Sequence, residues 1–69
     1  MEISARNVFE GVVDSVVTGA VNDEVTIRLP SGDTMVSIIT KNSAERLNLK
    51  KGGKVYAIVK ASNVMLAVD

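Results

Sequence analysis

The stretch Glu24–Thr40, EVTIRLPSGDTMVSIIT, decides the fold of this chain. Its first six residues alternate strictly between apolar and polar side chains, which is typical of a strand with one face in a core and one in water. The segment Pro30–Asp33 then predicts a tight turn, because proline presets the first φ angle and glycine accepts a positive one. The following residues, Thr34–Thr40, are predicted to form a second strand. The whole stretch is therefore a β-hairpin.

The segment before the hairpin, Asn7–Val17, is predicted to be a long first strand with apolar residues on both faces. Gly11 lies inside it and indicates a bulge or a sharp coil, which a strand needs if it is to serve two edges of a small barrel. The only helical signal follows the hairpin, between Thr40 and Leu49, where Asn42 and Glu45 have capping-box spacing. This helix is predicted to be one to two turns long.

Two more strands are predicted near the C-terminus, over Lys54–Lys60 and Val64–Val68, and Gly52 offers a glycine for the end of the helix. The order of elements is that of the OB fold. We therefore predict an all-β domain over residues 1–69, a five-stranded OB-like barrel with one short helix between the third and fourth strands. A five-stranded SH3-like barrel is the alternative.

Composition limits what so small a barrel can do. The chain has 69 residues, eight Lys and Arg against eight Asp and Glu, and neither Cys nor His. Without those two residue types, zinc sites, thiol nucleophiles and imidazole bases cannot be built, so we expect no enzyme, no cofactor and no metal centre. Chains of this size bury only roughly 60% of their unfolded surface and usually need extra support. Because the first and last strands are apolar on both faces, we expect an obligate homo-oligomer.

Charge and aromatic content argue against two further classes of protein. Single-stranded nucleic acids are bound in basic grooves with aromatic platforms, whereas this chain has no net charge and only Phe9 and Tyr56 as aromatic residues. No apolar run approaches the roughly 18 residues of a membrane span, and no signal-peptide pattern is present. We therefore expect a soluble cytoplasmic protein that binds neither nucleic acid nor membrane.

Three short polar stretches adjoin surfaces that should be buried: Ser4–Asn7, Thr40–Ser43 and Lys60–Asn63. Each has an ordinary structural explanation as well, since Arg6 can be a solvated cation and Thr40–Ser43 a plain helix cap. Lys60 shares a strand face with Tyr56, so an interface there would partly desolvate its ammonium group and require an anion nearby. Together the stretches offer cations, hydroxyl groups and free backbone amides.

Such a set of donors fits a small tetrahedral oxyanion held between subunits, because a dianion needs several converging donors and some positive charge. Phosphate at neutral pH carries a proton and needs an acceptor as well. A pocket made of donors alone therefore favours sulfate, molybdate and tungstate over phosphate.

The same stretches carry a resemblance that spans the whole chain. The motifs that carry it are Ser4-Ala5-Arg6-Asn7, Ser37-Ile38-Ile39-Thr40 with Ser43, Leu47, Leu49 and Gly52, then Val59-Lys60-Ala61-Ser62 and Val64-Met65. In these motifs the sequence resembles the molbindin family of molybdate-binding Mop domains. The resemblance implies an OB-like fold, a homohexamer built as a trimer of dimers, and molybdate or tungstate bound at subunit interfaces. Storage or buffering of the oxyanion in the cytoplasm is the role it implies.

The resemblance also implies roles for individual residues. Ser4 and Arg6 would donate to the oxyanion from one subunit, with the backbone of Ala5 and Asn7 nearby. Hydroxyl and amide donors would come from Thr40 and Ser43. The pocket would be completed by Lys60, the amide of Ala61, and Ser62.

Two other functions stay open at the level of sequence. One is a nucleic-acid-binding OB module. The other is a purely structural oligomerisation domain, in which Arg6 and Lys60 pair with carboxylates such as Glu2 or Glu10.

Overall fold

The predicted hairpin is present in the computed structural model, which describes residues 1–69. Strand β2 runs over Asn22–Arg28 and pairs antiparallel with β3, Thr34–Thr40. The alternation has the expected effect, because Val25 and Ile27 are only 1% and 4% exposed, whereas Glu24 and Arg28 on the other face are exposed and Thr26 is half-buried. In the turn, Gly32 has a φ angle of 94°, which only glycine adopts without strain.

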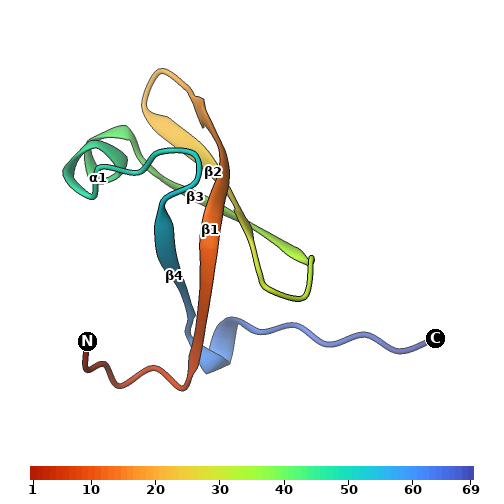
Figure 1. The fold of residues 1–69 in the computed structure, drawn as a ribbon. Helices are drawn as coiled ribbons and strands as arrows, with labels where there is room; N and C mark the ends of the chain where they lie inside the picture. The colour runs from red at the N-terminus through yellow and green to blue at the C-terminus, as the bar shows by residue number, and fades with distance from the viewer.

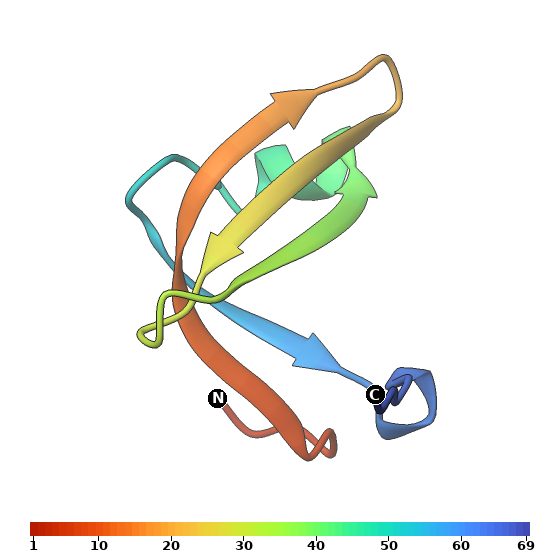
Figure 2. The ribbon, with the colours of Figure 1, turned by 90° about the vertical axis from the view of Figure 1, so that its right-hand side faces the viewer.

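Strand β1, Asn7–Thr18, is long and strongly curved (Figure 2), and it pairs with two neighbours. Its second half pairs with β2, and its first half pairs with β4, Lys54–Val59, so the sheet order is β3-β2-β1-β4. The register shifts between Val13 and Ser15, so the predicted bulge lies there and not at Gly11. Gly11 serves a close approach instead, since a Cβ atom on it would lie 2.6 Å from the backbone oxygen of Arg28.

The single α-helix, α1, covers Lys41–Arg46 and lies where β3 ends (Figure 1). Its N-cap is Thr40, whose side-chain oxygen accepts a hydrogen bond from the backbone N–H of Ser43. The prediction of a helix cap within Thr40–Ser43 is therefore confirmed at Thr40, whereas the capping box of Asn42 with Glu45 does not form, because the helix already begins at Lys41. Asn48, with a φ angle of 53°, takes the left-handed position after the helix that was expected of Gly52. No helix is long and apolar enough to cross a membrane.

The predicted fifth strand, Val64–Val68, does not form. After β4 the chain makes a 3-10 turn, η1, over Ala61–Asn63, and the last six residues then run away from the sheet (Figure 1). We call Val64–Asp69 the C-terminal arm. A strand exists only where its backbone pairs with a neighbour, and the arm meets none within one chain. The all-β class is confirmed, but as a curled four-stranded sheet, a half-barrel.

The core of this half-barrel is small. Four apolar residues are buried, namely Val13, Val25, Ile27 and Ala44. Many large apolar side chains are exposed on the other face of the same strands, with Val36 at 61% and Ile38 at 67% on β3. The strands therefore carry apolar side chains on both faces, as predicted. Exposed apolar surface of this extent is typical of a contact with another molecule.

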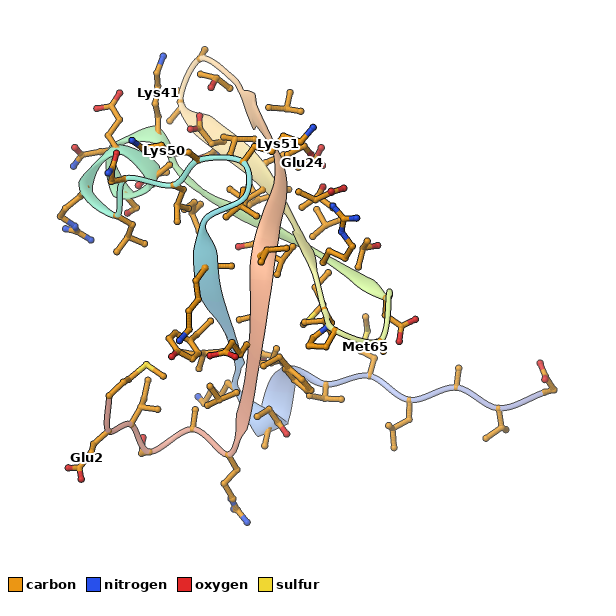
Figure 3. The ribbon with its side chains drawn as sticks, viewed as in Figure 1. Glu2, Glu24, Lys41, Lys50, Lys51 and Met65 are labelled. Atoms are coloured by element: carbon orange, nitrogen blue, oxygen red, sulfur yellow. The ribbon has the colours of Figure 1, made fainter.

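The close approach at Gly11 yields a testable prediction. Gly11→Ala should lower the free energy of unfolding by about 1 to 3 kcal/mol, because the added methyl group meets a backbone oxygen that cannot move aside. Urea titration at fixed protein concentration measures the effect. The control is Glu24→Ala on β2, whose side chain is exposed (Figure 3) and whose loss should change the value by less than about 0.5 kcal/mol. Equal effects of the two substitutions would contradict this account of Gly11.

Candidate functional site

Two of the three polar stretches lie together at the base of the sheet, where β1 begins and β4 ends. Asn7 pairs with Val59 in the strand register, and its side-chain amide donates a hydrogen bond to the Val59 backbone oxygen at 3.2 Å. This contact places Arg6, just before the pair, next to Lys60, just after it. We call Ser4–Asn7 together with Lys60–Ser62 the base half-site.

The two cations of the base half-site have no carboxylate partner. Both Arg6 and Lys60 are exposed, and the ion pairs of the chain are those of Arg28 with Asp14 and of Lys54 with Glu10. Two positive charges are therefore free to meet an external anion.

Glu10, which was a candidate partner for these cations, is already engaged. Its carboxylate lies 2.9 Å from the Lys54 ammonium group, and the hydrogen bond between them lowers the pKa of Glu10 and raises the pKa of Lys54. The Lys54 ammonium group also lies 5.3 Å from the centre of the Tyr56 ring. The other candidate, Glu2, points away from the sheet near the N-terminus (Figure 3). Neither carboxylate neutralises Arg6 or Lys60 within one chain.

Neutral donors accompany these cations. The backbone N–H groups of Ala61 and Ser62 open the η1 turn and donate to no backbone oxygen, as expected at the start of a helical turn. The hydroxyl groups of Ser4 and Ser62 make no hydrogen bond within the chain and are exposed. The base half-site therefore offers two cations, two hydroxyl groups and free amides, with no acceptor carboxylate among them.

The third polar stretch lies at the other end of the structure. Thr40 pairs with Asn22 in the sheet, beside the end of β1, whereas the base half-site adjoins the start of β1 (Figure 1). The hydroxyl groups of Thr40 and Ser43 are 2.8 Å apart and bond to each other at the start of α1. We call Thr40 and Ser43 the helix half-site. One chain does not bring the two half-sites together.

The geometry thus supplies two open half-sites and no enclosed pocket around either. An anion at the base half-site would meet Arg6, Lys60 and the η1 amides on one side only. Because a tetrahedral dianion accepts hydrogen bonds in all directions, a closed cage requires donors from a second molecule. The structure contains no cluster of three or more His, Cys, Asp and Glu residues that could hold a metal ion.

One carboxylate lies in the core. Asp23 belongs to β2 and is only 4% exposed. Its Oδ1 atom is buried without a hydrogen-bond partner, beside a hollow of about 310 Å³ that Glu45 also lines. The signal was present in the sequence, since Asp23 has the same parity as the buried residues Val25 and Ile27. Asp23 lies near the helix and belongs to neither half-site.

Comparison with known proteins points to one family. The family model of the TOBE domain matches residues 3–66. The molybdenum transport protein ModE of Azotobacter vinelandii is 46% identical over 69 residues, which is 100% of this chain and 26% of ModE. A probable molybdenum-pterin-binding protein of Haemophilus influenzae is 41% identical over 69 residues, which is 100% of both chains.

A solved structure agrees with these matches. The cytoplasmic molybdate-binding protein ModG, crystallised with molybdate bound, superposes with a TM-score of 0.96 and 45% identity. The match covers 100% of this chain and 49% of the ModG chain. This chain therefore spans about half of ModG, and 26% of the ModE proteins of two bacteria.

The unpartnered carboxylate of Asp23 yields a second prediction. Asp23→Val should raise the free energy of unfolding by about 1 to 3 kcal/mol, because a buried acceptor without a partner costs that much and valine suits a strand. Thermal unfolding measures it. The neighbouring Glu24→Val, the same change on the exposed face of β2, should alter stability by less than about 0.5 kcal/mol. A loss of stability in Asp23→Val would mean that the carboxylate has a partner.

Proposed function

The chain belongs to the TOBE domain family, as a domain of the molbindin type, and from this we propose that it binds molybdate or tungstate as intact oxyanions. Residues 1–69 act as one Mop domain that holds the ion in pockets between subunits of a homo-oligomer. The protein stores or buffers the oxyanion in the cytoplasm. It is not an enzyme, and it uses no cofactor or resident metal ion.

The observation that carries this proposal is the pair of unneutralised cations at the base half-site. Arg6 and Lys60 flank the paired residues Asn7 and Val59 next to the free amides of η1, and neither forms an ion pair with a carboxylate of the chain. This arrangement would be unfavourable in a subunit interface unless an anion filled it. Because the surroundings offer donors and no acceptor, the anion that fits is fully deprotonated at neutral pH, as molybdate and tungstate are.

The assembly we propose is a homohexamer, a trimer of dimers, as the molbindin resemblance implies. Its support in this chain is the exposed apolar surface of the two outermost strands, where β4 contributes Tyr56 at 42% exposure and Ile58 at 41%, and β3 contributes Val36 and Ile38. Burial of such apolar surface in an interface contributes about 25 cal/mol per Å² to the free energy of association. Assembly also supplies what a single chain lacks, a second set of donors opposite each half-site.

The alternatives are less well supported by these residues. A nucleic-acid-binding module would need a basic groove, whereas the chain has no net charge and two aromatic residues. A purely structural oligomerisation domain would be expected to pair Arg6 and Lys60 with Glu2 or Glu10, and Glu10 bonds to Lys54 instead. The longer ModE relatives contain further sequence, so their transport-related activity is not part of this proposal.

Isothermal titration with molybdate tests the function. Arg6→Ala and Lys60→Ala should each weaken binding by roughly one to two orders of magnitude, because a hydrogen bond to a charged group contributes about 1.5 to 3 kcal/mol. The matched control is Lys51→Ala, which removes an equal charge from an exposed turn at the end of the structure far from the base half-site (Figure 3).

The control variant should bind as the unaltered chain does. Sedimentation of each variant shows whether the assembly persists, so that weaker binding can be assigned to the pocket and not to dissociation. Molybdate should also raise the melting temperature of the unaltered protein, because a ligand of the folded assembly stabilises it. If the titration detects no binding of molybdate, the proposed function is wrong.

Selectivity follows from the size of the cage. Sulfate has the same charge and shape as molybdate but is smaller, so it should leave the hydrogen bonds of a rigid cage too long and bind more weakly. Tungstate differs little from molybdate in size and should bind similarly. Competition titrations against molybdate measure both ratios. Equal affinities for sulfate and molybdate would show that the donors form no fixed cage.

A further inference from the structure

A buried carboxylate without a partner lies where strand β2 begins. Asp23 is only 4% exposed, and its Oδ1 atom accepts no hydrogen bond. Neither of the two ion pairs of the chain involves it. An ionised group that leaves water without a compensating charge lowers the stability of the folded state. A ligand that carries positive charge would remove this penalty.

The carboxylate borders a hollow with room for such a ligand. The hollow has a volume of about 310 Å³, and four of its seven lining residues are polar. We call it the helix hollow and define it by these polar residues, Thr18, Asp23, Glu45 and Asn48. A water molecule occupies about 30 Å³ in the liquid. The helix hollow can therefore hold a small ion together with several of its waters.

Separate elements bring these polar residues together. Thr18 lies directly opposite Asp23 in the register of β1 with β2, so the two side chains share a face of the sheet. Glu45 comes from α1, which lies beside the sheet near the start of β2 (Figure 1). Asn48 follows the helix in the left-handed conformation. The helix hollow thus joins a strand pair to the helix and the loop after it.

The chemistry of the lining points to a cation. The side chains of the helix hollow offer oxygen atoms from two carboxylates, one hydroxyl group and one amide, and no Lys or Arg lines it. Hard divalent cations such as Mg²⁺ and Ca²⁺ take oxygen ligands of these kinds. A water molecule alone could bond to the Asp23 Oδ1 atom, but it would leave the buried charge uncompensated. Two carboxylates match the charge of one divalent ion.

We propose that the helix hollow binds a hydrated divalent cation such as Mg²⁺ or Ca²⁺, with Asp23 and Glu45 as its charged ligands. The ion keeps several of its own waters, as Mg²⁺ does when only one or two carboxylates bind it. The chain has no cluster of three or more acidic residues. Binding is therefore weak, with a dissociation constant of roughly 1 mM. The ion exchanges with solvent, so the site is not a resident metal centre.

A bound ion would have a structural effect. Because Asp23 belongs to β2 and Glu45 to α1, an ion between them ties the helix to the sheet. The proposal goes beyond the oxyanion function and does not depend on it, since neither residue belongs to a half-site. Without the ion the Asp23 carboxylate stays unpartnered, so the comparison of Asp23→Val with the unaltered chain applies to cation-free buffer.

Thermal unfolding without molybdate tests the site. About 10 mM MgCl₂ or CaCl₂ should raise the melting temperature of the unaltered chain by about 5 °C over NaCl of equal ionic strength, because the ion is then at roughly ten times its dissociation constant. Asp23→Asn and Glu45→Gln should each lose most of this rise. Both substitutions keep the shape of the side chain and remove its charge.

The matched control is Glu24→Gln, which removes the same charge from the next residue, on the exposed face of β2. It should keep the full rise in melting temperature. If Asp23→Asn also keeps the full rise, or if the unaltered chain gains none, the proposal is wrong. Equal losses in Glu24→Gln and Asp23→Asn would likewise contradict it, because the ion would then respond only to the total charge.

A second measurement locates the ion without any substitution. Mn²⁺ takes carboxylate and water ligands as Mg²⁺ does, and it broadens the NMR signals of nearby nuclei. The amide signals of Thr18, Asp23 and Glu45 should broaden at lower Mn²⁺ concentrations than those of the exposed residues Glu2 and Asp33. Broadening that begins at Glu2 or Asp33 would overturn the proposal. Neither experiment contains molybdate, so the cation site and the oxyanion function can each fail without the other.

Discussion

The structure depends on a sheet that is one strand short of closing. Four curled strands enclose a core of only a few fully buried side chains, and the edges of β3 and β4 are left without hydrogen-bond partners. A chain of this size has little surplus stability, so uncovered apolar edges and faces weigh heavily in its folding. Further strand pairing at these edges and cover for the apolar face would therefore both stabilise the sheet.

The candidate site follows from this incompleteness. The long strand β1 passes from a pairing with β2 to a pairing with β4, and the pair Asn7–Val59 at its start lies between Arg6 and Lys60 in the register. The same long strand keeps Thr40 and Ser43 at the opposite end. Donors divided in this way would surround an anion on one side only within a single chain.

The sequence predicts most of the sheet because alternation has a direct structural consequence. The residues of β2 point alternately inward and outward, and Val25 and Ile27 fill the core as their spacing requires. The same rule applied to Asp23 would have predicted its burial, but its polar character and nearby turn signals favoured a solvated position. The helix was placed correctly, although its cap lies at Thr40, where the direction of the incoming strand decides.

The amino-acid sequence by itself determined the all-β class, the hairpin, the position of the helix, and the set of donors in Ser4–Asn7, Thr40–Ser43 and Lys60–Asn63. It also determined that the arm is apolar. Only the tertiary structure decided which donors meet in one chain and that Val64–Asp69 leaves the sheet. The reason is physical: side-chain pattern is a local property, whereas the partner of a strand and the neighbours of a cation depend on the path of the whole backbone.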